Sequence, residues 1–411
     1  MKRVVVTGMA GISPLGCDWP TVSARLKSMK NAVVRMAEWS KYKGLNTNLA
    51  APAAEFTLPP ERYSRKHTRS MDRVALLAVR ASDLALDDAG LQGAPVISSG
   101  ATGVAYGSST GGTQAVGDFA RMLHNFSTDG ITATTYIRMM GHTAPVNIGI
   151  FFKAKGRIIT TSSACTSGSQ AIGYSYEAIK TGKQTIMIAG GAEELSPTEA
   201  AVFDTLFATS TRNDAPETTP SPFDRDRDGL VIGEGAGTLI LEELEHARAR
   251  GARIYAEITG FGTNSDGWHV THPNAETMQA AIQGALDDAG LQPGVIGYVN
   301  AHGTATDNGD VAETTATAKI FGNKVPFSSL KSYMGHTLGA CGALEAWMTI
   351  MMMREGWAAP TLNLNNVDPK CGDLDYVRGA IRPLSTDTVM SNNFAFGGIN
   401  TSLIFKRWSE A

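Results

Sequence analysis

The chain contains little cysteine, little net charge and no long apolar segment. Its four cysteines lie far apart without a Cys-x-x-Cys pair, which argues against zinc ribbons and a disulfide framework. The formal net charge of −3 provides no basic footprint for nucleic acid. No uninterrupted apolar run approaches the roughly 20 residues that cross a bilayer. We therefore expect neither a nucleic-acid partner nor a membrane span.

Two further features are too weak to support an assignment. The segment after Met1 is basic, but Gly8 and Pro14 follow at once, so it is predicted to be a buried first strand and not a signal peptide. A cytoplasmic location is expected. His269 and His272 could hold a metal ion, but no third ligand is evident, and no metal site is predicted.

Apolar strands alternate with amphipathic helices along the chain, which is typical of an α/β fold. Strands are predicted at 4–7, 103–106, 157–160, 185–189, 237–241, 254–258, 297–300, 325–328 and 402–405. Helices are predicted at 72–89, 168–180, 275–289, 311–320 and 339–355. The first and third of these helices both end in Asp-Asp-Ala-Gly-Leu, in which glycine can adopt the left-handed terminating conformation. This echo indicates either one capping solution used twice or a duplicated fold.

Cys165 lies in the most informative segment, Thr161-Thr-Ser-Ser-Ala-Cys-Thr-Ser-Gly-Ser169. The segment joins a β-branched run to a helical stretch. At such a turn, backbone N–H groups and the helix dipole favour a thiolate, and small neighbours let a large substrate approach the sulfur. Cys165 is therefore predicted to be a nucleophile. The alternative is an inert packing thiol.

The second half of the chain carries two histidines in glycine-framed turns. His302 lies in Asn-Ala-His-Gly-Thr-Ala-Thr, and His336 lies in Met-Gly-His-Thr-Leu-Gly-Ala. A late Phe-Ala-Phe-Gly-Gly segment contains Phe396. Together with Cys165 upstream, this set resembles the elongating β-ketoacyl-acyl-carrier-protein synthases, the decarboxylating branch of the thiolase-like condensing enzymes. The resemblance covers essentially the whole chain.

The resemblance implies a thiolase-like layered αβαβα fold made of two duplicated halves. Residues 1–250 would carry the nucleophilic cysteine and residues 251–411 both histidines, so the active site would form where the halves meet. The family completes its acyl pocket across a dimer interface, which implies a homodimer or a heterodimer with a related subunit. The implied partner is an acyl carrier protein. No cofactor is expected, because phosphopantetheine arrives on that carrier as part of the substrate.

The implied reaction is a decarboxylative Claisen condensation, in fatty-acid, aryl-polyene or polyketide chain elongation. Cys165 would hold the acyl group, with the oxyanion bound by its own backbone N–H and that of Phe396. Neutral imidazoles of His302 and His336 would donate hydrogen bonds to the malonyl thioester oxygen. Lys331 would keep them neutral, and Glu313 is expected to be its partner. A surface ion pair is the alternative for these last two residues.

Four more residues receive binding roles by resemblance. Thr304 and Thr306 match the hydroxyls that hold a phosphopantetheine arm, although turn residues bonding their own backbone would look alike. Phe396 matches a gating phenylalanine, and the two glycines after it favour mobility. Phe203 matches a pocket-facing neighbour of the cysteine.

Other positions bear on the acyl chain and on the carrier. Thr110 is small and polar where the family often has a larger aliphatic residue that limits the acyl pocket. Arg65, Lys66 and Arg69 retain the basic character of the family's carrier-docking face. Phe207 occupies a site that is often arginine, which puts the identity of the cognate carrier in doubt.

Three other families share some of these features. A short-chain dehydrogenase would explain Tyr176 and Lys180 as a Tyr-x-x-x-Lys pair, but Ile12 and Pro14 stand where a dinucleotide loop needs glycine. A non-decarboxylating thiolase would need a second acid/base cysteine, for which Cys341 is the candidate. A non-catalytic chain-length-determining subunit would have lost its reactive cysteine.

Overall fold

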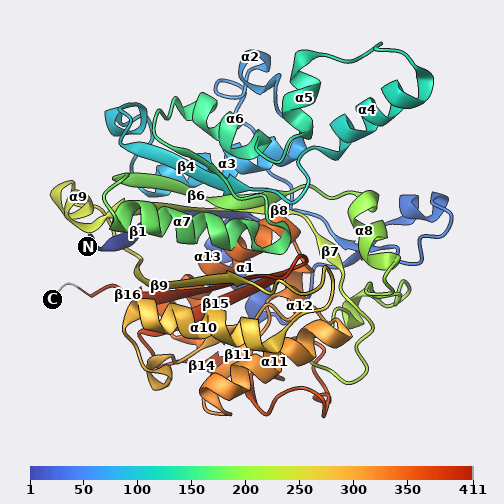
Figure 1. Cartoon of the computed structure of the whole chain (residues 1–411), viewed down its shortest axis with the longest axis vertical. Helices are drawn as coiled ribbons and strands as arrows, with labels where there is room; N and C mark the ends of the chain where they lie inside the picture. The colour runs from blue at the N-terminus through green and yellow to red at the C-terminus, as the bar shows by residue number, and fades with distance from the viewer. Residues whose placement is uncertain (410–411) are drawn as a thin grey trace.

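The computed structural model describes residues 1–409 as a stack of helical and sheet layers (Figure 1). Eleven strands form one sheet in the order β13-β11-β10-β15-β16-β9-β1-β8-β6-β4-β5. In chain order their bounds are β1 Val4–Ile12, β4 Thr102–Gly107, β5 Ile158–Thr160, β6 Ile186–Glu193, β8 Gly235–Glu243, β9 Ala256–Ser265, β10 Val299–Asn300, β11 Pro326–Ser328, β13 Asp375–Tyr376, β15 Thr388–Ala395 and β16 Ile399–Arg407. The remaining strands are short: β2 Val34–Arg35, β3 Leu49–Ala51, β7 Ile232–Gly233, β12 Trp357–Ala358 and β14 Arg382–Pro383.

The sheet consists of two runs of strands, β1-β8-β6-β4-β5 and β9-β16-β15-β10-β11-β13, and the helices lie outside and between these runs. Their bounds are α1 Trp19–Lys27, α2 Arg65–Thr68, α3 Arg73–Asp88, α4 Thr113–Asn125, α5 Ala133–Met139, α6 Thr143–Phe152, α7 Ser167–Lys180, α8 Pro197–Asp204, α9 Leu244–Ala249, α10 Ala275–Ala289, α11 Asp307–Phe321, α12 Lys331–Met334 and α13 Cys341–Glu355. Figure 1 shows α3 and α6 above the upper run, α7 and α13 in the middle, and α10 and α11 below the lower run. No helix within residues 1–409 is long and apolar enough to cross a membrane.

The two runs of the sheet share one strand plan. In the first, β1 is antiparallel to β8, β8 is antiparallel to β6, and β6, β4 and β5 are parallel. In the second, β9, β16, β15, β10 and β11 repeat these relations in the same sequence. β1 and β9 pair at Val4–Val6 and join the runs. The repeated Asp-Asp-Ala-Gly-Leu therefore belongs to equivalent helices, α3 and α10, and the boundary predicted at residues 250 and 251 falls between α9 and β9.

The central helix α13 is buried because it is apolar on nearly every side. All residues of α13 from Cys341 to Ile350 are buried. The close approach of α7 and α13 requires glycine on both. A Cβ on Gly168 would lie 2.9 Å from the backbone nitrogen of Ala343, and one on Gly342 would lie 2.6 Å from that of Ser169.

The α/β prediction is confirmed, but one central strand was missed. All nine predicted strands and five predicted helices are present, with shifted ends. Strand β15 was not predicted because Ser391, Asn392 and Asn393 interrupt its apolar pattern. These polar side chains are nevertheless buried, and Asn393 belongs to the site described next.

Candidate active site

Cys165 lies in a 3₁₀ turn, η3 (Ala164–Thr166), directly before α7 begins at Ser167. Ala164 adopts a left-handed φ of 51°, a costly conformation that recurs where function requires a side chain to be aimed. The cysteine is buried, with only 4% of its surface exposed. The predicted strand-to-helix turn is thus present, and it presents the sulfur at the N-terminus of a central helix.

The resting sulfur is a thiol, which corrects the predicted thiolate. Burial raises the pKa of Cys165 to about 12, because a thiolate would lose its solvation. The charge of Lys331 and the backbone N–H groups of Phe396 and Cys165 itself oppose this rise without overcoming it. These are the two N–H groups predicted to bind the oxyanion, and both are directed at the sulfur.

The structure brings both histidines to the cysteine. One reactive atom from each of Cys165, His302 and His336 lies within 4.8 Å of the other two. The imidazole rings are nearly perpendicular, at 88°, with centroids 5.1 Å apart. His302 follows β10, and His336 follows α12. The trio therefore combines one residue of the first half with two of the second.

Both imidazoles are neutral and carry their proton on Nε2. Lys331 Nζ lies 3.2 Å from His302 Nδ1, and the backbone N–H of Leu338 donates to His336 Nδ1 at 3.3 Å. Each Nδ1 is thus an acceptor, which assigns the hydrogen to Nε2. Burial, reinforced by the positive charge of Lys331, holds the pKa of both histidines well below the ordinary range.

The predicted partner of Lys331 was wrong. Its ammonium pairs with Glu345 at 2.5 Å, and Asn393 also donates to that carboxylate. Burial alone would lower the pKa of Lys331, but the Glu345 carboxylate, together with Cys341 and Glu313, outweighs burial and the pKa is raised. Glu345 projects from α13 toward the lysine. Glu313 instead accepts hydrogen bonds from the backbone N–H groups of His302 and Gly303, at 2.7 Å each.

Glu345 could have been found from the sequence. It is the one acidic residue before the last turn of an otherwise apolar helix, Cys341–Glu355, and such a charge is rarely buried without a partner. Asn393 directly precedes the late segment that contains Phe396. Its role was not visible because the strand that carries it was not predicted.

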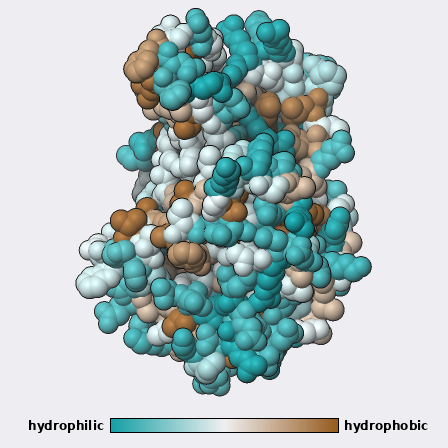
Figure 2. All heavy atoms as spheres, turned by 90° about the vertical axis from the view of Figure 1, so that its right-hand side faces the viewer, coloured by the Kyte–Doolittle hydropathy of each residue, from teal (hydrophilic) through white to brown (hydrophobic). Residues whose placement is uncertain are grey.

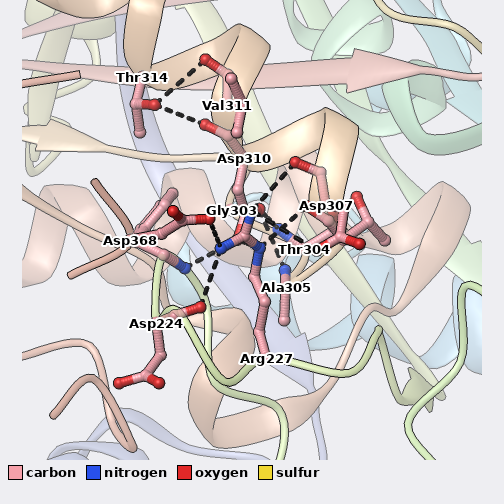
Figure 3. A network of polar contacts seen from close by, with 12 residues as sticks. Asp224, Arg227, Gly303, Thr304, Ala305, Asp307, Asp310, Val311, Thr314 and Asp368 are labelled. Carbon is pink, nitrogen blue, oxygen red and sulfur yellow. Dashed lines mark hydrogen bonds and ion pairs between the residues drawn. The ribbon is translucent and has the colours of Figure 1, made fainter. Parts of the chain in front are cut away.

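A buried ion-pair network holds the loop that contains Thr304 and Thr306 (Figure 3). Asp310 accepts from the backbone N–H groups of Thr304 and Ala305, at 3.1 Å each. Arg227 Nε lies 3.5 Å from Asp310, and its Nη1 donates to Asp368 at 2.7 Å. The two threonine hydroxyls are 2.9 Å apart. The buried residues Asp310, Arg227 and Asp368 thus hold the two threonines in position. The sequence analysis assigned no role to these three residues.

A cavity of about 490 Å³ leads from the trio to the surface and is lined by Thr304 and Thr306. Phe396 also lines it and packs against Phe203, with ring centroids 5.1 Å apart. Gly397 has a φ of 85° and free space beside it. The turn after Phe396 therefore has the conformational freedom that a hinge requires.

The remaining predicted residues lie away from this cavity. Thr110 lies in the turn after β4, and its hydroxyl is 3.3 Å from Glu199. Arg65, Lys66 and Arg69 are exposed on or beside α2, at the top of Figure 1 and not among the residues that line the cavity. The mouth instead exposes Phe207 (89%) and Val270 (70%).

The trio is close enough to hold a metal ion, but its electrostatics oppose one. Lys331 places a positive charge 3.2 Å from His302, and a bound cation would be repelled by it. His269 and His272 approach each other at 3.0 Å between their Nδ1 atoms, on an exposed loop. Two ligands do not complete a metal site.

The residues that would support a thiolase or a short-chain dehydrogenase make structural contacts instead. The thiol of Cys341 donates to the backbone oxygen of Cys165 at 3.2 Å, and burial raises its pKa well above the ordinary value. It is therefore a poor second acid/base group. Lys180 and Tyr176 both bond to Asp288, at 2.6 and 3.0 Å, and tie α7 to α10. Retention of Cys165 is contrary to a non-catalytic subunit.

Comparison with known proteins agrees with this geometry. The Beta-ketoacyl synthase N-terminal domain matches residues 1–247, and the C-terminal domain matches residues 255–365. The chain belongs to the β-ketoacyl synthase family. It is 38% identical to 3-oxoacyl-(acyl-carrier-protein) synthase 2 of Synechocystis sp., over 99% of this chain and 98% of that protein.

Solved structures extend the comparison. A β-ketoacyl synthase crystal structure from Burkholderia phymatum is 61% identical, with a TM-score of 0.98 and full coverage of both chains. The ishigamide ketosynthase/chain length factor is 29% identical, with a TM-score of 0.89 over 99% of this chain and 100% of that chain. The predicted thiolase-like layered fold is thereby confirmed.

Proposed function

We propose that the chain is an elongating β-ketoacyl-acyl-carrier-protein synthase, which joins an acyl group to malonyl-acyl-carrier protein with loss of carbon dioxide. One observation carries this proposal: two neutral imidazoles, each with an Nε2 hydrogen, stand within 4.8 Å of one buried cysteine. A thiol can hold one acyl group while two donors stabilise an enolate of the other. The condensing reaction requires both functions in one site.

In the first half-reaction, Cys165 Sγ attacks the thioester carbonyl of the acyl carrier. The developing oxyanion accepts hydrogen bonds from the backbone N–H groups of Cys165 and Phe396, which already face the sulfur. The phosphopantetheine sulfur leaves as a thiolate and takes up the proton of the Cys165 thiol. A cysteine that rests as a neutral thiol therefore supplies the proton that the leaving group requires.

In the second half-reaction, malonyl-carrier protein enters along Thr304 and Thr306. Its thioester oxygen accepts the Nε2 hydrogens of His302 and His336 as carbon dioxide leaves and the enolate forms. The enolate carbon then attacks the Cys165 thioester, which forms the new carbon–carbon bond, breaks the carbon–sulfur bond and releases a thiolate that regains a proton from water. Each such donor is typically worth about 3–4 kcal/mol in a dry site. No cofactor of the chain's own enters either step.

The carrier protein has to cover the cavity mouth, because its arm must reach Cys165. The Synechocystis relative is named for an acyl-carrier-protein substrate, which supports this partner. At the mouth, the exposed apolar side chains of Phe207, Val270 and Leu206 offer contacts that do not depend on charge. The docking role of Arg65, Lys66 and Arg69 stays a prediction, as does a cytoplasmic location.

A dimer is part of the proposal. The edge strand β5 leaves its outer side unpaired, with Ile158 43% exposed. The projecting α4–α5 segment in Figure 1 exposes Leu123, Phe126 and Tyr136, at 69%, 95% and 53%. Apolar surface of this kind marks a contact site. Figure 2 views the molecule from the right-hand side of Figure 1 and shows several brown apolar areas on a mainly hydrophilic surface. The occupant is a second copy or a related subunit, as the ketosynthase/chain length factor pairing suggests.

Intact-mass spectrometry provides the direct test. The enzyme is incubated with a panel of acyl carriers, then with malonyl-carrier protein. An acyl adduct on Cys165 and its loss as a β-ketoacyl carrier forms are expected. Fatty-acid and polyketide-type primers in the panel distinguish the two classes of pathway. Absence of any adduct on Cys165 would overturn the proposed function.

A further inference from the structure

The region behind Cys165 is bounded by α8 and by the turn after β4. Ala200 and Phe203 of α8 belong to the apolar cluster that contains the cysteine. Ser108 of the turn accepts a hydrogen bond from Ser162 at 2.7 Å, three residues before the nucleophile. An acyl chain on the sulfur has to leave the Thr304 side free for the second carrier arm. The chain would then extend into the region between α8 and this turn, where Ala200 and Phe203 pack in the same cluster as the cysteine.

Three buried glutamates surround that region, and two of them are fully engaged. Glu193 accepts hydrogen bonds from Ser108 Oγ, from the backbone N–H and hydroxyl of Ser109, and from the backbone N–H of Gly339, all between 2.5 and 3.0 Å. Glu194 accepts from the backbone N–H and hydroxyl of Thr113, at 2.7 and 2.5 Å. These two carboxylates organise the backbone around them.

Glu199 is different. It lies one helical turn before Phe203 on α8 and is 5% exposed. Among the described residues, its Oε2 has no hydrogen-bond partner, and its Oε1 accepts from the Thr110 hydroxyl at 3.3 Å, with the backbone of Ser196 also close to the carboxyl group. Burial, together with the nearby charges of Glu193 and Glu194, raises its pKa well above the ordinary value. Glu199 is thus a buried acid that its surroundings bias toward the neutral form, with one carboxyl oxygen left without a partner.

A neutral acid without a partner is costly in a protein interior, so a position of this kind is normally satisfied by a ligand, water or partner. Thr110 beside it is exposed in the single chain, which opens this end of the region. A carboxylic acid and a hydroxyl both donate and accept. A second hydroxyl is the group that completes such a pair.

We propose that Glu199 and Thr110 form the polar end of the acyl-chain chamber and select acyl groups that carry a hydroxyl at that depth. The hydroxyl would donate to the carbonyl oxygen of Glu199 and accept from Thr110 or from the acid proton. Plain alkyl chains of the same length would bury these polar groups unpaired. This inference rests on the proposed function, because it concerns the acyl group held by Cys165.

The test compares straight-chain alkanoyl carriers with the matching ω-hydroxy series, by the rate of Cys165 acylation measured by intact mass. In the dimeric wild-type enzyme, one chain length should show a preference for the hydroxylated member of about tenfold or more, equivalent to ~1.4 kcal/mol. Glu199→Leu should reverse this preference. Glu199→Gln, which is isosteric and retains a donor and an acceptor, should keep most of it.

Asp204 provides the matched control. It lies on the same helix and is equally buried, at 5%, but its carboxylate accepts from Asn46, Thr47 and Thr209. Asp204→Asn should lower the melting temperature without changing the hydroxyl-to-alkyl ratio. An equal ratio in wild type and Glu199→Leu at every length would overturn the inference, and would indicate that the partner subunit satisfies Glu199. Acylation of Cys165 by alkanoyl carriers in that same experiment would leave the proposed function standing.

Discussion

The two halves of the molecule contain equivalent turns that have been put to different uses. In the first half, η3 precedes α7 and places Cys165 at the wall of the cavity. In the second, a similar 3₁₀ turn, η6 (Leu338–Ala340), precedes α13, and Leu338 repeats the left-handed φ of Ala164, at 46° and 51°. The residue after Leu338 is Gly339. A Cβ there would lie 2.8 Å from Glu193 Oε2 and 3.0 Å from the Cα of Ser108.

The second turn is therefore closed where the first is open. Glu193, from the first half, accepts from the backbone N–H of Gly339 and fills the space in which a nucleophile would stand. Strand β4 is the counterpart of β10, which is followed by His302. β4 ends at Gly107, where a Cβ would lie 2.4 Å from the carbonyl oxygen of Thr161, so no side chain fits there. The first half thus provides the nucleophile, and the second half provides the histidines.

The largest effect should come from removing the nucleophile. Cys165→Ala is expected to abolish acylation and condensation while leaving the fold intact, because the substitution fits a small-residue turn. Cys165→Gln should still release carbon dioxide from malonyl-carrier protein, since its amide resembles an acylated cysteine and the second half is untouched. Radiometric carbon dioxide release measures decarboxylation, and circular dichroism measures whether each variant is folded. Normal elongation by a folded Cys165→Ala enzyme would refute the assignment.

The contribution of the second half is separable from the first. His302→Ala and His336→Ala should still form the acyl-enzyme, because the oxyanion donors belong to Cys165 and Phe396. Each should lose decarboxylation by about 10²-fold or more, the usual effect of removing one oxyanion donor. Single-turnover acylation and carbon dioxide release are measured separately. A variant that decarboxylates normally but cannot be acylated would place that histidine in the other step.

Lys331 tests why the second half keeps its histidines neutral. Lys331→Met removes the positive charge that lowers the pKa of both imidazoles, so their pKa values should rise. Each imidazole would then become protonated at a higher pH. The acid-side loss of decarboxylation should accordingly begin at a higher pH than in wild type, in a full pH–rate profile. An unchanged acid limb would show that Lys331 acts only through its ion pair with Glu345.

Gly339→Ala tests the closure of the second turn. The added methyl would meet both Glu193 and the Ser108 backbone, and overpacking of this kind typically costs about 1–3 kcal/mol. The free energy of unfolding from denaturant titration should fall by that amount. Gly117→Ala is the control, because a Cβ there meets nothing within 4 Å. Equal stability of the two variants would mean that the second turn is not closed.

The smallest effect is expected at the cavity mouth, which both halves share. If the carrier contacts an apolar rim, its KM in wild type should change little with salt. Phe207→Ser should raise that KM by about fivefold, or ~1 kcal/mol, and leave kcat unchanged. Phe207→Arg should make KM salt-dependent. A strong salt dependence in wild type would favour docking through the basic residues near α2.

Sequence reasoning reached the catalytic trio because each member lies in a turn of small residues, and such turns are local patterns. It failed where partners come from distant elements. Glu313 was assigned to Lys331 by resemblance alone, while Glu345 lies on a helix that the same reasoning treated as apolar packing. Burial likewise reverses the expected ionisation of Cys165, because desolvation depends on everything that surrounds a group and not on its own segment. Strand β15 was missed for the same reason: Asn393 reaches its partner, Glu345 on a distant helix, only in the folded chain.

The pairing of β1 has a consequence for synthesis. All nine residues of this apolar strand are buried, and its partners are β8, reached at Glu243, and β9, reached at Ile258. Such non-local pairing is slow to form and leaves apolar chain exposed in the meantime. β1 therefore cannot pair with a neighbouring strand until the chain has been synthesised as far as Glu243. Chaperone binding during translation should protect this segment, and slowing the ribosome before Glu243 should increase aggregation.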